Sequence, residues 1–371
     1  MRKPYLDNLR WATGLLVVLY HVFYIYNAQG VAGGFRPVAG LAVQWFDVLL
    51  YAVYPWFMPL LFIVSGVCAR LYLERHTDRA FIVSRTDKLL VPSTLGLFAF
   101  QFLQGLVNLS LNDAYLDIQA LPLSARLLIV VACGIGVLWF IQMLWLFSML
   151  LVLLRKLEGD RLWRMGGSMN TLGLVAMTAA VWASMQVLNA PVITVYRFGL
   201  YGLMFLLGYF VFSHDEVIDR LKACFRPVLA AALALGAAFC AVYFGQNYAE
   251  APVNRSPLYA AFAWAPCLAA LGGMARYGND ETRPTRWLSK RSFGLYVFHY
   301  LAISAVALLL AKLGKLPAAM IYPLSAVAGF GGGYLLNAVI SRIPVYRWLV
   351  LGIREDRLHH RADPIRNSIE R

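Results

Sequence analysis

Long apolar runs separated by short polar segments repeat along the whole chain. An apolar run of about 20 residues is long enough to cross the hydrocarbon core of a bilayer as a helix. The sequence therefore predicts an all-α fold, a polytopic membrane helical bundle of about ten transmembrane helices. The predicted spans lie near residues 9–28, 43–72, 89–110, 137–154, 171–189, 196–212, 227–245, 257–275, 292–311 and 318–340.

Composition agrees with this pattern, because 60% of the 371 residues are hydrophobic and only 14% are charged. We expect residues 1–341 to form one transmembrane domain and residues 342–371 to form a short basic cytoplasmic tail. That tail is too short for a soluble catalytic domain, so any chemistry should take place among the helices. The five cysteines occur singly, without the spacing of a zinc site, and no metal is expected.

The net charge of +14 is distributed over alternate polar segments. If the N-terminus is cytoplasmic, 27 of the 33 Lys and Arg residues fall on the cytoplasmic side. Such an excess is typical of cytoplasmic loops and predicts an even number of spans with both termini in the cytoplasm. It explains the positive charge without a nucleic-acid partner, and it predicts a multi-pass protein of the plasma membrane, the inner membrane in bacteria.

Arg10 and His21, the ionisable residues of the first apolar run, are eleven positions apart. Eleven residues make about three helical turns, so both side chains should share one face, about 16 Å apart along the axis. A guanidinium at the membrane edge would then stand in line with an imidazole deep in the bilayer. Because an ionisable side chain is costly at that depth, His21 is predicted to be functional.

Asp47 and His299 are further polar candidates within predicted spans. If the first two spans are antiparallel neighbours, Asp47 lies at a depth comparable to that of His21 and would orient and charge the imidazole. The alternative is that Asp47 marks the outer end of its helix. His299 should lie nearer the inner face than His21, either as a ligand-binding residue or as an interhelical hydrogen bonder.

Basic residues also gather after the second span, at Arg70, Arg85 and Lys88. The cytoplasmic excess of positive charge explains them without any function. However, Arg85 and Lys88 are three positions apart at the start of a predicted helix and should share a face. Together with Arg10 they would surround the inner mouth of the first helices, where charge-assisted contacts suit a phosphate group.

Several short motifs occur in a fixed order along most of the chain. They are residues 5–10 followed by His21, residues 58–66, Arg85 and Lys88 followed by Pro92, residues 138–140, residues 292–299 and residues 342–344. In these motifs the chain resembles the membrane acyltransferase-3 family, and most closely its periplasmic-glucan succinyltransferase-like branch. At position 88 the family usually has arginine, and this chain has lysine. The planar, forked guanidinium is thereby replaced by the point charge of an ammonium group.

The resemblance implies an acyl-CoA-dependent O-acyltransferase. Such an enzyme would move a short acyl group, of the acetyl or succinyl class, from cytoplasmic acyl-CoA to a hydroxyl of an extracytoplasmic glycan or another envelope acceptor. It implies that His21 is the essential histidine and Arg10 its partner. We expect Asp47 to assist His21, and Arg10, Arg70, Arg85, Lys88 and His299 to bind the acyl-CoA donor.

Two mechanisms stay open at this point. Neutral His21 would take the proton from the acceptor hydroxyl as that oxygen attacks the thioester, or His21 would itself be acylated first. A different class of protein, a secondary transporter or flippase for an envelope precursor, would also be a helical bundle with glycine breaks. The run Gly331-Gly332-Gly333 has no counterpart in the first half of the chain, which favours the enzyme.

Overall fold

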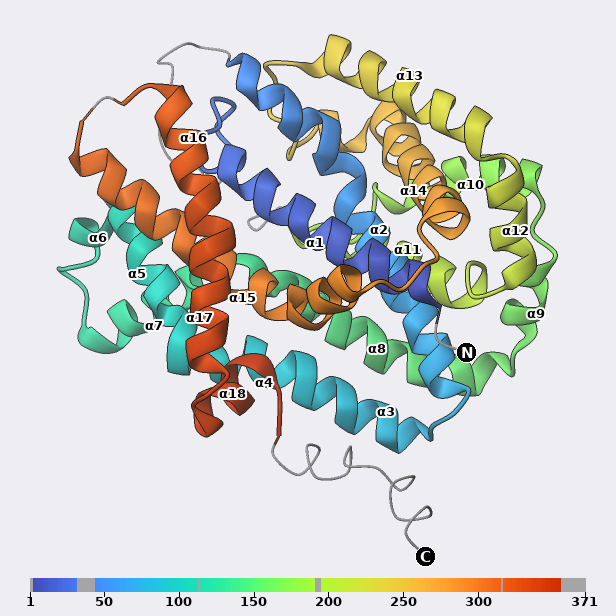
Figure 1. Ribbon diagram of the computed structural model, residues 1–371, viewed down its shortest axis with the longest axis horizontal. Coiled ribbons are helices and arrows are strands. Elements are labelled where there is room, and N and C mark those ends of the chain that lie inside the picture. The colour runs from blue at the N-terminus through green and yellow to red at the C-terminus, as the bar shows by residue number, and fades with distance from the viewer. Residues whose placement is uncertain (1–2, 32–43, 113, 191–194, 315, 355–371) are drawn as a thin grey trace, which may run out of the picture.

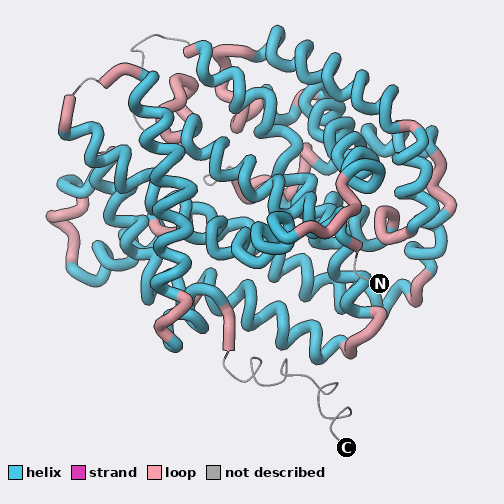
Figure 2. Tube along the Cα trace, in the orientation of Figure 1, coloured by secondary structure: helices cyan, strands magenta, loops and turns pink. Residues whose placement is uncertain are grey.

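The apolar runs of the sequence become helices that pack around a central α1 (Figure 1). The computed structural model describes residues 3–31, 44–112, 114–190, 195–314 and 316–354. Within these ranges the chain forms helices and turns, and no strand (Figure 2). The predicted all-α class is therefore confirmed for the part of the chain that is described.

Some predicted spans are single helices and others are interrupted. The uninterrupted ones are α1 (Pro4–Tyr24), α2 (Val48–Leu73), α8 (Trp139–Glu158), α10 (Thr171–Ser184), α11 (Phe198–Phe210), α13 (Phe225–Tyr243), α14 (Pro257–Tyr277) and α15 (Arg283–Lys312). The third span consists of α3 (Asp78–Arg85), η2 (Thr86–Leu90), α4 (Val91–Ser93), η3 (Leu97–Gln101) and α5 (Phe102–Leu111). The last span consists of α16 (Ala318–Val327), η6 (Ala328–Gly332) and α17 (Gly333–Ile340).

Short helices connect the spans. They are α6 (Ala114–Asp117), α7 (Leu123–Cys133), α9 (Arg161–Gly167), α12 (Asp215–Ala223) and, after the last span, α18 (Pro344–Leu351). Both η2 and η6 are π-helical turns. Such turns insert one residue into the helical register and occur frequently at functional sites.

Seven helical stretches of the described chain are long and apolar enough to cross a membrane. They are Trp45–Leu73, Asp78–Leu111, Gly136–Glu158, Phe225–Tyr243, Pro257–Tyr277, Arg283–Lys312 and Ala318–Ile340. Of the other predicted spans, α10 and α11 are only 14 and 13 residues long, and the 21-residue α1 carries Arg10 and His21. The structure thus supports a multi-pass membrane protein, while the count of ten stays a prediction.

Burial separates the helices at the centre from those at the periphery. Within the apolar windows, 61% of α15 is buried, but only 11% of α13 and 22% of the Ala318–Ile340 stretch. Apolar side chains on the last two remain exposed, including Leu233 on α13 and Leu335 on α17. In a membrane these exposed faces contact lipid, and α1 contacts α2, α14 and α15 inside the bundle.

The close packing of α2 against α11 depends on two glycines. A Cβ added to Gly66 would lie 2.0 Å from the backbone oxygen of Phe205, and one added to Gly208 would lie 2.0 Å from that of Ile63. Small residues let transmembrane helices approach until their backbones touch. The pair holds α2 in place, and α2 supplies one wall of the cavity described below.

The polar segments predicted to be cytoplasmic lie on one side of the molecule, and in the described chain they are found around residues 3–10, 70–88, 155–164, 220–226, 276–291 and 342–354. Their contacts join Lys3 to Asp215 (2.7 Å), Asn8 to the Asp280 carbonyl (3.0 Å), Trp163 to Ser213 (3.0 Å), Arg70 to Asp160 (2.7 Å) and Asp87 to Arg354 (3.2 Å). Lys3 and Arg354, near the two ends of the described chain, share this side. That it faces the cytoplasm stays a prediction.

Candidate functional site

Two histidines from distant parts of the chain meet inside the bundle. His21 comes from the last turns of α1 and His299 from the middle of α15, and His299 Nε2 lies 3.2 Å from His21 Nδ1. His299 is fully buried, whereas His21 is half-buried. The expectation that His299 lies nearer the inner face is wrong, because a direct contact places both rings at the same depth.

Backbone carbonyls determine where the protons of this pair lie. His299 Nδ1 is 2.8 Å from the Tyr296 carbonyl, and His21 Nδ1 is 2.8 Å from the Val17 carbonyl. A carbonyl only accepts, so each Nδ1 carries a proton in the neutral ring. The single proton on His21 Nδ1 is then shared between the Val17 carbonyl and His299 Nε2, and the lone pair of His21 is left on Nε2. The pair therefore presents His21 Nε2 as a base or nucleophile.

A glycine-rich turn lets the last span press against α15 beside the histidines. A Cβ added to Gly333 would lie 3.2 Å from the Cα of His299, and one added to Gly329 would lie 3.0 Å from atoms of Ile303 and Val18. Gly333, the last residue of the glycine run, therefore has a packing role here, as does the nearby Gly329. These two glycines bring η6 and α17 close enough to support both histidine helices.

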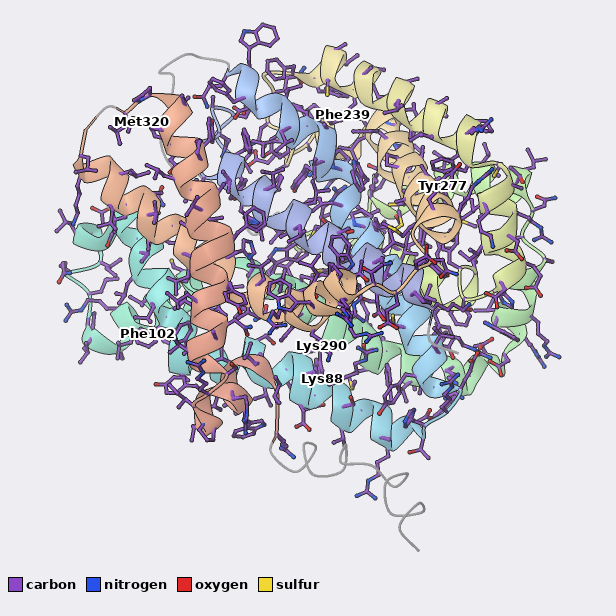
Figure 3. The ribbon with its side chains drawn as sticks, in the orientation of Figure 1. Lys88, Phe102, Phe239, Tyr277, Lys290 and Met320 are labelled. Atoms are coloured by element: carbon purple, nitrogen blue, oxygen red, sulfur yellow. The ribbon has the colours of Figure 1, made fainter. Side chains whose placement is uncertain are left out.

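Basic side chains surround a cavity of about 410 Å³ on the polar side of the molecule. Among the residues that the structure describes, four cations line it: Arg10 from α1, Arg85 and Lys88 from the start of the third span, and Lys290 from α15. In Figure 3 the labelled Lys88 and Lys290 lie near each other between α15 and the α3–α4 stretch. The predicted cluster of Arg10, Arg85 and Lys88 is thus brought together in space.

The interrupted third span places Arg85 and Lys88 on this cavity. Arg85 is the last residue of α3 and Lys88 lies in the π-helical turn η2. The guanidinium of Arg85 stands 4.9 Å over the ring of Phe81, which is fully buried and fixes the position of the charge. A cation held by an aromatic ring in this way keeps its side chain directed at the cavity.

Lys290 is the functional candidate that the sequence reading missed. The ninth span was expected to begin near residue 292, which left Lys290 in a loop. In fact α15 begins at Arg283, with Thr282 and Thr285 forming a capping box and Pro284 in the first turn. This start signal is readable in the sequence, and it would have placed Lys290 on a helix two turns inside its N-terminus.

Neither histidine lines the described cavity, but residues near the pair do. Ser65 and Cys68 of α2 line it, as does Tyr296 of α15. Tyr296 lies three residues before His299, and its carbonyl is the one that accepts from His299 Nδ1. The lining of the cavity therefore comes within one helical turn of His299.

The profile of the acyltransferase-3 family, which describes an acyltransferase domain, matches residues 3–342. The chain belongs to the acyltransferase-3 family. Family membership supports an acyltransferase that is embedded in a membrane, in agreement with the apolar helices. Comparison with curated proteins found no match, and neither did comparison with solved structures.

Asp47 does not contact the histidine of this acyltransferase. Its Oδ2 accepts from the backbone nitrogen of Ala28 at 2.9 Å, and the neighbouring Gln44 donates to the Tyr26 carbonyl at 2.8 Å. Within the described chain no hydrogen bond or ion pair joins Asp47 to His21. The expected catalytic pairing is therefore not formed, because Asp47 joins the chain after α1 to the start of α2. The ring that contacts His21 is instead that of His299.

Arg70 does not line the cationic cavity either. Its guanidinium lies 2.7 Å from Asp160 and 3.1 Å from Glu74, and it stands 4.0 Å over the ring of Trp163. These contacts join the end of α2 to the segment around α9. The predicted role of Arg70 in donor binding stays a prediction, and its position outside the cavity and its paired charge favour a structural role.

Part of the predicted tail belongs to the site. Leu351, Gly352 and Ile353 line the cavity, and Arg354 lies 3.2 Å from Asp87. Gly352 has a φ of 64° and its added Cβ would lie 2.3 Å from the Asp87 backbone oxygen, so glycine is required there. The chain after the last span thus returns to close the cavity, and residues 355–371 lie outside the described residues.

Proposed function

We propose that this acyltransferase uses acyl-CoA to O-acylate an envelope acceptor. It would move a short acyl group, of the acetyl or succinyl class, to a hydroxyl of an extracytoplasmic glycan or another envelope molecule. The observation that carries the proposal is the common helix α1, which contributes Arg10 to the cationic cavity and His21 to the histidine pair. Eleven residues of helix separate them by about 16 Å along the axis.

The cavity has the charge that the nucleotide end of acyl-CoA requires. That end carries a diphosphate and a further phosphate on its ribose, and Arg10, Arg85, Lys88 and Lys290 supply positive charge from separate elements. Charge-assisted hydrogen bonds to phosphate are among the strongest polar contacts in proteins. The pantetheine arm would then extend past Ser65 and Tyr296 and present the thioester carbonyl to His21.

The proposed reaction balances with His21 as the proton carrier. His21 Nε2 takes the proton of the acceptor hydroxyl while the hydroxyl oxygen bonds to the thioester carbonyl carbon. The tetrahedral intermediate then loses its carbon–sulfur bond, and His21 returns the proton to the leaving CoA thiolate. The products are the acyl ester and free CoA. His299 would orient the ring throughout by accepting from His21 Nδ1.

The alternative route with a covalent intermediate uses the same atom. His21 Nε2 would attack the thioester first, release CoA thiol, and hand the acyl group to the acceptor in a second step. This route does not need donor and acceptor to be present at the same time. A burst of CoA release without acceptor, one per enzyme, identifies it.

We also assign the protein to the periplasmic-glucan succinyltransferase-like branch of the family and to the bacterial inner membrane. The motif in residues 292–299 and the cation cluster support this assignment, with Lys88 as the departure from the usual arginine. Mass analysis of envelope glycans from cells with and without the protein tests it. A succinyl or acetyl ester that disappears with the protein is the expected result.

The direct test measures CoA release by the purified protein with acetyl-CoA and succinyl-CoA. Wild-type protein should release thiol, and His21→Ala should not, because the base or nucleophile is removed. His76→Ala is the matched control, since His76 is exposed in the loop after α2. Thiol release that survives in His21→Ala would contradict the proposed chemistry, while wild-type protein inert to every acyl-CoA would contradict the proposed donor.

A further inference from the structure

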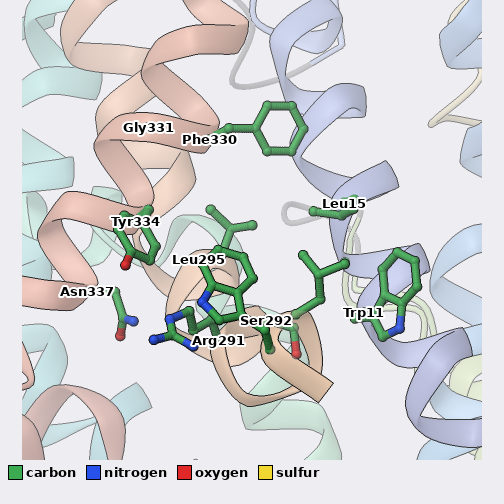
Figure 4. A pocket seen from close by; sticks show the side chains of 12 residues that line it. Trp11, Leu15, Arg291, Ser292, Leu295, Phe330, Gly331, Tyr334 and Asn337 are labelled. Atoms are coloured by element: carbon green, nitrogen blue, oxygen red, sulfur yellow. The ribbon is translucent and has the colours of Figure 1, made fainter. Parts of the chain in front are cut away.

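A second cavity, of about 340 Å³, lies between α1, α15 and the last span (Figure 4). Its lining is mostly apolar, with Leu15, Leu295 and Phe330 contributed by three different elements. In Figure 4 Phe330 lies at one end, and Arg291 and Asn337 lie at the opposite end. The cavity is therefore apolar along its length and cationic at one end.

Arg291 supplies the charge, and two aromatic rings hold it. Its guanidinium stands 4.5 Å over the ring of Trp287 and 6.0 Å over that of Tyr334. The two rings stack with centroids 5.8 Å apart. No ion pair links Arg291 to a carboxylate among the residues that the structure describes. The charge is thus fixed in position but is not neutralised there.

Consecutive residues of α15 divide their charges between the two cavities. Lys290 lines the cationic cavity and Arg291 lines the apolar one, while Gly14, Ser292 and Asn337 line both. The two cavities therefore share a wall, but a different cationic residue lines each of them. The role proposed for the cationic cavity leaves Arg291 without a function.

The apolar cavity lies on the lipid-facing side of the bundle. The Ala318–Ile340 stretch that forms one wall is only 22% buried within its apolar window. Trp287 is 46% exposed and Tyr334 42% exposed. Tryptophan and tyrosine are enriched at the level of lipid headgroups, so these rings indicate the depth at which Arg291 lies.

We propose that this cavity binds one anionic glycerophospholipid. An acyl chain would lie between Leu15, Leu295 and Phe330, and the headgroup phosphate would contact Arg291. Charge complementarity selects this occupant, because basic pockets between transmembrane helices bind anionic headgroups. The lipid would come from the leaflet on the side of the cationic cavity, where the charged ends of the helices gather.

The acyl chain of the donor is a poorer fit for this cavity. Arg10, Lys88 and Lys290 lie on the cationic cavity, together with Tyr296, the residue one turn from His299. A donor bound there would present its thioester on the other side of the shared wall. The lipid proposal does not depend on the identity of the donor, and its test needs no measurement of acyl transfer.

Competition between two lipids tests the proposal. The purified protein is equilibrated with mixed micelles that contain equal amounts of phosphatidylglycerol and phosphatidylcholine, and lipids that remain bound are counted by native mass spectrometry. We expect one phosphatidylglycerol to be retained with a preference of roughly fivefold, since one cation near the surface contributes about that factor. Arg291→Gln should abolish the preference, and Arg291→Lys should keep it.

Two further variants separate the cavity from general surface charge. Arg283→Gln removes an exposed charge from the same helix and should leave the preference unchanged. Gly331→Leu adds bulk at a cavity-lining position where an added Cβ meets no atom within 4 Å, and it should lower retention of both lipids. Equal retention of the two lipids by wild-type protein, or a preference that survives in Arg291→Gln, would overturn the proposal. So would unchanged retention in Gly331→Leu.

Discussion

His299 Nε2 lies 3.2 Å from His21 Nδ1, and the carbonyls of Tyr296 and Val17 determine the direction of that hydrogen bond. In the proposed reaction His299 is therefore a positioning residue, because it would hold the ring of His21 with the basic Nε2 atom directed away from it. In a base and orienter pair the orienter is more often a carboxylate. Here a neutral imidazole would orient His21 inside a helical bundle, where a buried carboxylate would be costly.

The first prediction concerns this pair. His299→Ala should lower kcat for acyl transfer by about 100-fold, since the ring of His21 loses its orientation, and should leave the KM for the donor nearly unchanged. His299→Gln, which keeps an acceptor for His21 Nδ1, should recover part of the rate. A rise in KM with kcat unchanged would instead mean that His299 binds the donor directly.

The second prediction concerns the cationic cavity. Neutralising Arg10, Arg85 or Lys290 to Gln should raise the KM for acyl-CoA by roughly 10-fold or more, because each removes a charged contact to phosphate. The same variants should affect an acyl-pantetheine donor much less, since that donor lacks the nucleotide phosphates. Arg283→Gln is the matched control on α15. Equal losses with both donors would show that these residues position helices.

Cys68 provides a reporter for occupancy of the same cavity. It lines the cavity beside the cations and is only partly buried, so a small maleimide should label it. Bound CoA should slow that labelling severalfold, as measured by mass spectrometry of the peptide that carries Cys68. Cys133, which is also partly buried and lies outside this cavity, should react at the same rate with and without CoA. Unchanged labelling of Cys68 at saturating CoA would contradict donor binding here.

Periodicity predicted the helices of this protein well, because a membrane requires long apolar runs and each run is visible in the sequence. Contacts between distant helices were less predictable. His299 was singled out, yet its depth was misjudged, since the register of α15 against α1 depends on packing at Gly329 and Gly333. No local signal in the sequence fixes that register.

The basic residues assigned to the donor site also show that local patterns are predictable from the sequence and distant contacts are not. Arg10, Arg85 and Lys88 were predicted to lie together, and all three line one cavity. Two signals supported that grouping, the excess of positive charge in the predicted cytoplasmic loops and the three-residue spacing of Arg85 and Lys88 on a helix. Arg70 was grouped with them on charge alone, and its partners Asp160 and Trp163 are about 90 positions away in the sequence. A residue's partners, more than its own type, decide whether its charge is available to a ligand.

The paired state of Arg70 gives a prediction about stability. Arg70→Ala should lower the free energy of unfolding by about 1–2 kcal/mol, because it removes a largely buried guanidinium and leaves Asp160 without its cation. The KM for the donor should not change. Arg75→Ala, at an exposed position five residues further on, should have little effect on the thermal midpoint in detergent. A raised KM without loss of stability would return Arg70 to the donor site.

The last prediction concerns the sides of the membrane from which the substrates approach. The cations that line the cavity belong to segments that share one side of the molecule, and the charge pattern predicts that this side is cytoplasmic. In sealed vesicles, acyl-CoA added on that side should acylate an acceptor enclosed on the other, and free CoA should appear where the donor was added.

The orientation of the protein in the vesicle membrane must be known before the result can be interpreted. Labelling of Arg75→Cys with a membrane-impermeant maleimide, in protein whose five native cysteines are replaced by serine, reports which side faces out, because Arg75 lies in the loop that joins α2 to α3. Activity with donor supplied only from the opposite side would contradict the cationic cavity as the donor site. Passage of an unmodified solute without consumption of thioester would favour transport over acyl transfer. Vesicles in which only the acyl group crosses, with CoA retained on the side of addition, are the expected outcome. In the proposed reaction the nucleotide would be held at the mouth while the thioester reaches His21.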